Sequence, residues 1–216
     1  ITVGAQHAYY LLAEALFDVN QRVGLEEPGH PHARNSFAPR HPQCLPLAVD
    51  AQGLKVDRLP PLDYVFVTPS HQSPTTGTLS MERRRLLLQK AQDKDFVVIE
   101  DDYEAENLYE GVPVPALKSL DKVGRVIYVG SISKSLSPSL RLGYIVAPRP
   151  LIAELRVLRH AMVRHPSAFL QHAFAHFLSL GHHETHARRV NQALQARMQA
   201  LREALCRELP DFQFAL

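Results

Sequence analysis

The sequence predicts an α/β fold in which helices cover both faces of a mostly parallel central sheet, followed by a helical C-terminal segment. Short, nearly continuous apolar runs, such as 95–102 (DFVVIEDD) and 125–131 (RVIYVGS), are typical of strands buried on both faces. Segments with helical spacing separate these runs along the chain. From residue 149 onward the apolar spacing is wholly helical. We therefore expect a sheet domain over 1–148 and a helical continuation over 149–216.

The first half of the chain supplies two helices and two strands. Helical spacing behind a glycine predicts a helix that starts near Ala5. Residues 22–27 (RVGLEE) are expected to form a short strand, and residues 64–70 (YVFVTPS) a buried strand that ends in Pro and Ser. Residues 80–92 (SMERRRLLLQKAQ) are expected to form a helix, for which Ser80 is the N-cap because its hydroxyl can accept a first-turn amide.

The second half adds one more expected strand, at 143–148 (GYIVAP), after the two apolar runs named above. The helical segment that follows contains two expected breaks. One lies at His165-Pro166, because proline lacks the amide hydrogen that a helix interior needs. The other lies around Gly181, because glycine commonly ends helices.

Composition limits the classes of partner and compartment. The hydrophobic fraction of 45% and charged fraction of 21% are ordinary for a globular domain, and the net charge of +2 gives no electrostatic reason to expect nucleic acid or membrane as a partner of this segment. The two cysteines, Cys44 and Cys206, form neither a disulfide framework nor a metal motif, so we expect a reducing, cytoplasmic setting. No apolar run approaches the length of a transmembrane helix.

The two ends of the sequence indicate a piece of a longer protein. The chain opens on ITVGAQHAYY without an initiator Met, and it closes on DFQFAL, in what reads as an unfinished strand. We therefore expect an excised segment.

Polar residues follow each predicted strand, and in open α/β sheets ligands bind outside the carboxyl ends of the strands. These residues therefore nominate a site. They are Thr68, Ser70, His71, Gln72 and Ser73, then Glu100, Asp101, Asp102 and Tyr103, then Gly130, Ser131, Ser133 and Lys134, with Arg141 beyond. An anion site, an acidic pair with a tyrosine, and a lysine are thus expected at one rim.

This combination matches what pyridoxal 5'-phosphate requires, namely a lysine for a Schiff base, a carboxylate for the protonated ring nitrogen and a phosphate cradle. Lys134 is the expected lysine and Asp101 the expected carboxylate, chosen by its spacing to Tyr103, with Asp102 as the alternative. Tyr103 is placed to donate to the phenolic oxygen of the ring. The expected phosphate cradle consists of Ser131, Ser133, Arg141 and the backbone amides of Gly4, Ala5 and Gln6 at a helix N-terminus.

Three separated blocks of the sequence resemble a known family. They are 68–84 (TPSHQSPTTGTLSMERR), 98–106 (VIEDDYEAE) and 128–148 (YVGSISKSLSPSLRLGYIVAP). The chain resembles the large domain of fold-type I pyridoxal-phosphate enzymes, the aspartate aminotransferase superfamily. Within it, these blocks resemble the aminotransferase-like domain of MocR-type bacterial regulators of the GntR superfamily. Aminotransferases of the aminoadipate and kynurenine branch share the last two blocks more loosely. The resemblance covers essentially the whole chain.

The resemblance implies a role for each matching residue. Lys134 forms the internal aldimine, Asp101 pairs with the pyridine nitrogen and Tyr103 binds the ring oxygen, whereas Ser131, Ser133 and Arg141 bind the phosphate. Two positions depart from the family pattern. His30 stands where the family usually has an aromatic residue that stacks on the cofactor ring. Ser73 stands where aminotransferases place an asparagine near the ring oxygen.

The resemblance also implies parts that this sequence does not show. Regulators of this type carry an N-terminal winged helix-turn-helix domain for DNA binding, and a C-terminal small domain that grips a substrate carboxylate with an arginine. Residues 149–216 are expected to lead toward that small domain. Dimerisation is implied, because such proteins build their site across a dimer interface.

Three functions remain open at this point. The first is a sensor domain of a transcriptional regulator, in which a small amino acid or amine effector displaces Lys134 from the cofactor. The second is an aminotransferase, in which the released Lys134 moves the α-proton. The third is a scaffold that binds no cofactor. His182 and His186 have the i, i+4 spacing of metal ligands, but no third ligand is evident and no metal site is expected.

Overall fold

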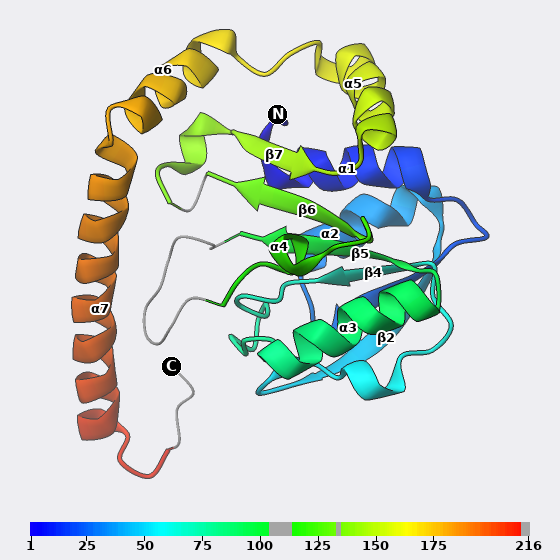
Figure 1. Cartoon of the computed structure of the whole chain (residues 1–216). Helices are drawn as coiled ribbons and strands as arrows, with labels where there is room; N and C mark the ends of the chain where they lie inside the picture. The colour runs from blue at the N-terminus through cyan, green and yellow to red at the C-terminus, as the bar shows by residue number, and fades with distance from the viewer. Residues whose placement is uncertain (104–113, 133–134, 213–216) are drawn as a thin grey trace.

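The computed structural model describes residues 1–103, 114–132 and 135–212. Its centre is a seven-stranded sheet with the order β3-β2-β1-β4-β5-β6-β7 (Figure 1). The strands are β1 (Arg22–Glu27), β2 (Gln43–Asp50), β3 (Gly53–Leu54), β4 (Tyr64–Val67), β5 (Val97–Asp102), β6 (Val126–Ser131) and β7 (Gly143–Val146). The five central strands run parallel, and β3 and β7 pair antiparallel at the two edges. The mostly parallel sheet is confirmed.

Helices cover both faces of this sheet, as predicted. One face carries α1 (Gly4–Leu16), α2 (Pro31–Phe37) and α5 (Arg149–Val163), and the other carries α3 (Met81–Asp93) and the short α4 (Leu117–Leu120). Figure 1 shows α3 crossing one face, with α1 on the opposite one. Single 3₁₀ turns, η1 (Ala38–Arg40), η2 (Val56–Arg58) and η3 (Pro138–Leu140), lie in the connections.

The apolar residues of the central strands divide between two cores by simple alternation. In β4, Phe66 packs into the core beneath α1, whereas Val65 and Val67 pack into the core beneath α3. In β5, Ile99 and Val98 divide in the same way. Successive side chains of a strand point to opposite faces, so a sheet covered on both sides needs the near-continuous apolar runs that the sequence contains.

The start of α1 is tied to the edge strand β7. The helix begins at Gly4, one residue before the predicted start, where the backbone has a φ of 79°. Thr2 N donates to Gly143 O at 2.8 Å, and Gly143 N donates to Thr2 O at 3.1 Å. The first turn of α1 is therefore held beside the segment that contains Arg141.

The C-terminal segment is helical, as predicted, and continues from α5 into α6 (Ala168–Ser179) and α7 (His182–Glu208). The predicted breaks are confirmed, because α5 ends before Pro166 and Gly181 caps α7 with a left-handed φ of 71°. Neither α6 nor α7 contains a buried residue in the part of the chain that the structure describes. Figure 1 shows them arching around one side of the sheet. No helix among the described residues is long and apolar enough to cross a membrane.

Strands β2 and β3 and helices α2 and α4 have no counterpart in the sequence prediction. Strand β2 contains Pro46, and most of its side chains are at least partly exposed, so it lacks the buried apolar run that marks the other strands. Helix α2 spans only seven residues and starts at Pro31, within a stretch that reads as a loop. Ser80 caps α3 as predicted, since its hydroxyl accepts the amide of Arg83 at 3.4 Å.

Candidate functional site

A cavity of about 390 Å³ lies at the carboxyl ends of the central strands. Its lining comes from the first turns of α1, the loops that follow β1 and β4, and the ends of β5 and β6. The lining residues are Ala5, Gln6, Tyr9, His30, His32, Ser73, Tyr103, Ser131 and Arg141. Seven of the eleven residues that the sequence analysis assigned to the cofactor site, all except Gly4, Asp101, Ser133 and Lys134, therefore surround one cavity.

One end of this cavity is suited to an anion. The Arg141 guanidinium lies beside Gly4, about 3.5 Å from where a β-carbon on that glycine would stand, and its Nη2 donates to Val3 O at 3.3 Å. The first amides of α1 have no acceptor within the helix and carry the positive end of its dipole. Ser131 adds a hydroxyl to the same lining. A glycine, an arginine and free helix-start amides together form a cradle that a phosphate group fits.

A buried carboxylate lies against this cavity. Asp101 is 1% exposed, and the hydroxyl of Tyr9, which lines the cavity, donates to its Oδ2 at 2.6 Å. Its Oδ1 is buried and has no hydrogen-bond partner within residues 1–103, 114–132 and 135–212. Burial raises the pKa of Asp101 to about 7. An unpartnered, buried carboxylate oxygen fits a protonated ring nitrogen, because such a donor supplies the charge and hydrogen bond that Oδ1 lacks.

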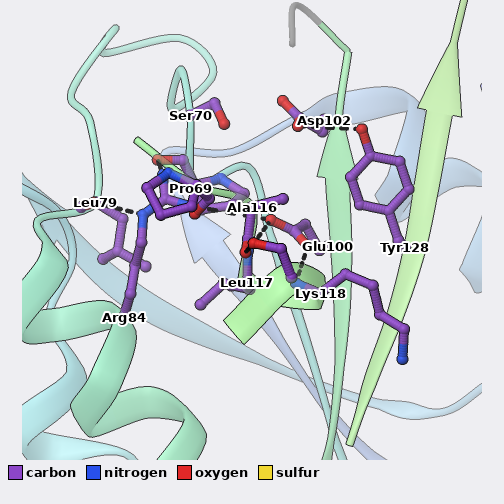
Figure 2. Close-up of polar contacts among 12 residues, drawn as sticks. Pro69, Ser70, Leu79, Arg84, Glu100, Asp102, Ala116, Leu117, Lys118 and Tyr128 are labelled. Atoms are coloured by element: carbon purple, nitrogen blue, oxygen red, sulfur yellow. Dashed lines mark hydrogen bonds and ion pairs between the residues drawn. The ribbon is translucent and has the colours of Figure 1, made fainter. Parts of the chain in front are cut away.

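The geometry favours Asp101 over Asp102 for this position. Asp101 shares its strand face with Ile99, on the side of the sheet covered by α1. Asp102 points to the other face, where Tyr128 donates to its Oδ2 at 3.2 Å (Figure 2). Only the first of these two carboxylates is in hydrogen-bond contact with a residue that lines the cavity, among the contacts of the described residues.

Aromatic and imidazole rings form another part of the cavity lining. The ring of His30 lies 5.4 Å from that of His32 and 6.5 Å from that of Tyr103, in edge-to-face arrangements. His30 comes from the loop that joins β1 to α2, where it is the N-cap residue of that helix. A flat ring bound in the cavity has these rings as neighbours.

The loop that carries Ser73 is fixed by a buried carboxylate on β1. Glu26 accepts the Thr68 amide at 3.1 Å and the Thr68 hydroxyl at 2.7 Å. The same hydroxyl oxygen accepts the Ser73 amide at 3.1 Å, and Gln72, which is also buried, donates to the Pro28 carbonyl at 2.9 Å. These bonds hold the end of β4 against the end of β1, so Ser73 has a defined position on the cavity wall.

Lys134 and Ser133 lie outside the described residues. Their neighbours in the chain are at the rim, since Ser131 lines the cavity and Ile132 N donates to Leu142 O at 3.1 Å. Strand β6, which ends at Ser131, therefore ends at the cavity edge.

Two residues of the lining, Tyr9 and His32, are not among those that the sequence nominates. Tyr9 follows Ala5 by four positions, so it lies on the same face of the helix as a nominated residue. That spacing was visible in the sequence, but a tyrosine in an apolar helix is usually a core residue. His32 belongs to helix α2, which the sequence does not predict, so the sequence gives no reason to place His32 near the site.

A second cavity, of about 600 Å³, lies between β7 and the helices α6 and α7. Its lining is largely apolar, with Leu142, Tyr144, Phe174 and Leu178 among its residues, and it contains none of the nominated side chains. Within the described part of the chain, no cluster of three or more His, Cys, Asp or Glu residues could hold a metal ion.

Comparison with known proteins places the chain among proteins of one family. The aminotransferase class I and II family model matches residues 1–215. The HTH-type transcriptional regulator TauR of Rhodobacter capsulatus is 44% identical over 95% of this chain and 43% of its own length. The probable rhizopine catabolism regulatory protein MocR of Rhizobium meliloti is 41% identical over 94% of this chain and 42% of its own length. The chain thus spans less than half of these curated relatives.

A solved structure gives the same fold. LysN, the α-aminoadipate aminotransferase of Thermus thermophilus, was crystallised with N-(5'-phosphopyridoxyl)-L-leucine. It matches with a TM-score of 0.90 and 29% identity, covering 97% of this chain and 56% of its own. The resemblance drawn from the three sequence blocks is confirmed. The chain belongs to the aminotransferase class I and II family.

Proposed function

We propose that this chain is the effector-sensing, aminotransferase-like domain of a transcriptional regulator and that it binds pyridoxal 5'-phosphate in the cavity at the ends of β5 and β6. The observation that carries the proposal is the buried Oδ1 of Asp101, which has no partner among the described residues and lies against a cavity with an anion cradle. The similarity to two regulators, over nearly all of this chain, supports the regulatory part.

In this proposal each nominated residue has a defined task toward the cofactor. Lys134 supplies the amine that attaches the cofactor. Asp101 Oδ1 accepts a hydrogen bond from the protonated ring nitrogen. Tyr103 donates to the phenolic oxygen of the ring. His30 covers one face of the ring, and Ser73 lies near the ring oxygen, as part of the same lining. The bound cofactor supplies an aldehyde that condenses with amines and a ring that withdraws electrons.

The phosphate is held at the opposite end of the cavity. Arg141 supplies the positive charge, Ser131 and Ser133 supply hydroxyls, and the backbone amides of Gly4, Ala5 and Gln6 complete the cradle. The position of Arg141 supports this assignment, because its guanidinium lies beside Gly4 at the start of α1 and donates to Val3 O.

The effector in this proposal is a small amino acid or amine, whose amino group replaces that of Lys134 on the cofactor. Residues 1–148 hold the cofactor, and residues 149–216 continue toward a small domain that contacts the effector carboxylate. DNA is contacted by a separate winged helix-turn-helix domain. The name of TauR, an HTH-type regulator, supports a separate DNA-binding domain, together with the fraction of its length that this chain matches.

An aminotransferase is the second candidate, favoured by the family model and by the similarity to LysN. The experiment that separates the two candidates loads the protein with pyridoxal 5'-phosphate, adds a panel of amino acids and measures both the absorbance spectrum and the release of 2-oxo acid. A sensor gives a stable spectral change without 2-oxo acid. Stoichiometric release of 2-oxo acid contradicts the sensor and supports the aminotransferase.

We further propose that the protein is a cytoplasmic homodimer. Both cysteines, Cys44 and Cys206, are free and exposed, which suits a reducing compartment. Large apolar side chains on the C-terminal helices are exposed, among them Phe169 at 79% and Val157 at 71%. Sedimentation equilibrium tests the dimer, with a monomer at all concentrations as the contradicting result.

A further inference from the structure

We propose that Tyr9 is a positioning residue that holds Asp101 with one carboxylate oxygen occupied and the other directed to the cofactor ring nitrogen. The inference rests on the proposed function, because it assigns Asp101 to the cofactor. The sequence did not nominate Tyr9, which looks like an ordinary core residue of α1.

The contact between Tyr9 and Asp101 is short and buried. The two side chains are 2% and 1% exposed, and the tyrosine hydroxyl donates to Asp101 Oδ2 at 2.6 Å, across 92 residues of chain. A hydrogen bond to a carboxylate in a buried setting is stronger than one between neutral groups. This bond fixes which oxygen of Asp101 is occupied.

The ring of Tyr9 is itself held in place. It makes edge-to-face contacts with Phe66 at 5.5 Å and with Phe37 at 6.3 Å between ring centroids, and with His30 at 6.2 Å on the cavity side. These contacts fix the orientation of the Tyr9 ring, and the hydroxyl therefore has a fixed direction toward Asp101. This is the arrangement expected of a residue that orients another.

The charges around Asp101 give the hydroxyl a second effect. The pKa of Asp101 is raised first by burial and then by the carboxylates of Asp102, Glu26 and Glu100, whereas the hydrogen bond from Tyr9 lowers that pKa. The pKa of Tyr9 is raised by burial, by Asp101 and by Tyr103, so its hydroxyl remains a donor at neutral pH. Removing the hydroxyl shifts Asp101 toward its protonated form, which cannot pair with a cationic ring nitrogen.

Tyr9→Phe isolates this effect, since it keeps the packed ring and removes only the hydroxyl. Two matched controls are available. Tyr10→Phe changes the neighbouring residue of the same helix, whose side chain is 37% exposed, and Tyr128→Phe removes the donor to Asp102 instead of Asp101. Thermal unfolding of each variant without cofactor shows whether the fold is kept.

The first measurement follows the Asp101 carboxyl carbon by NMR as the pH is varied, in the protein without cofactor. We expect the pKa of Asp101 to rise in Tyr9→Phe and to stay at the wild-type value in Tyr10→Phe. The second measurement is the dissociation constant for pyridoxal 5'-phosphate. We expect Tyr9→Phe to raise it about three- to tenfold, the net effect of one hydrogen bond, and to have no further effect in an Asp101→Asn background.

The outcomes separate this inference from the proposed function. If Asp101→Asn weakens cofactor binding and Tyr9→Phe changes neither the Asp101 titration nor the dissociation constant, the positioning role of Tyr9 is overturned and the cofactor site stands. If Asp101→Asn leaves the dissociation constant unchanged, both the role of Asp101 and the inference are overturned. An equal effect of Tyr9→Phe with and without Asp101 also overturns it, since Tyr9 then acts through another group.

Discussion

Arg84 and Glu100 face each other at 4.0 Å, and neither side chain is exposed (Figure 2). Arg84 on α3 donates to the carbonyl oxygens of Leu79 at 2.9 Å and Pro69 at 2.7 Å. Glu100 on β5 accepts the amides of Leu117 at 2.7 Å and Lys118 at 2.8 Å. The pair thereby joins α3, the loop after β4, α4 and the strand that carries Asp101.

Removing one partner of this pair should be costly. Arg84→Met leaves Glu100 buried without its cation and leaves the carbonyls of Leu79, Pro69 and Pro115 without their donor. We therefore expect a loss of about 3–5 kcal/mol in the free energy of unfolding. Urea unfolding measures it. Arg85→Met, at the exposed neighbouring position, is the control and should change the free energy by less than about 0.5 kcal/mol. Equal effects of the two substitutions contradict the account.

The pH dependence of stability should reveal the buried carboxyl of Asp101. Burial raises its pKa from 3.8 to about 7, so the folded state holds the proton more tightly than the unfolded state. The contribution of the Asp101 carboxyl to the free energy of unfolding is therefore full below about pH 4, and it is lost as the pH rises through about 7. Asp101→Asn removes this loss. Without cofactor, the free energy of unfolding of the variant should therefore exceed that of the wild type by about 2–4 kcal/mol at pH 8.

Urea unfolding at pH 5 and pH 8, without cofactor, checks this prediction. Glu82→Gln on the exposed side of α3 is the matched control for removal of a carboxyl group. An Asp101→Asn variant whose stability tracks that of the wild type across this range contradicts the prediction. So does one that is less stable than the wild type at pH 8.

Gly143 should tolerate no side chain. A β-carbon there would lie 2.8 Å from the Gly4 carbonyl carbon and 2.9 Å from Thr2 Oγ1, and the backbone of Gly4 cannot move without displacing the first turn of α1. We expect Gly143→Ala to destabilise the protein by about 1–3 kcal/mol and to weaken binding of pyridoxal 5'-phosphate. Val146→Ala, on the same strand at a position 45% exposed, is the control. Unchanged cofactor affinity in Gly143→Ala contradicts the placement of the cradle.

His30 should tolerate a larger ring. A phenol ring covers more of a bound aromatic ring than an imidazole does, so we expect His30→Tyr to lower the dissociation constant for pyridoxal 5'-phosphate by about two- to tenfold. His41→Tyr, at an exposed position after η1, is the control. An absorbance titration measures both. Weaker binding in His30→Tyr, with the fold intact, contradicts the assignment of His30 to the ring face.

Three of the predicted strands share one physical property. β4, β5 and β6 are buried on both faces, so their sequences must be apolar throughout, and the residues that follow them had to meet at one rim. β2 was not predicted, because most of its side chains are at least partly exposed and Pro46 lies within it. Its sequence therefore shows neither a continuous apolar run nor a clear alternation of apolar and polar residues.

Contacts across the chain explain what the sequence could not show about the site. Tyr9 and Asp101 lie 92 residues apart, and only the packing of α1 on the sheet brings them together. The same holds for Glu26, whose bonds to Thr68 depend on the pairing of β1 with β4. Residue types and spacing predicted which strand ends lie around the cavity, whereas the supporting hydrogen bonds follow from tertiary packing.

Covalent trapping of the cofactor on Lys134 tests the central claim most directly. The protein is incubated with pyridoxal 5'-phosphate, reduced with borohydride, digested and analysed by mass spectrometry, beside a Lys134→Ala variant. The account predicts one stoichiometric adduct, on the peptide that contains Lys134, together with a visible absorbance band that is absent from the variant. An adduct spread over exposed lysines, or the same band in Lys134→Ala, would contradict it.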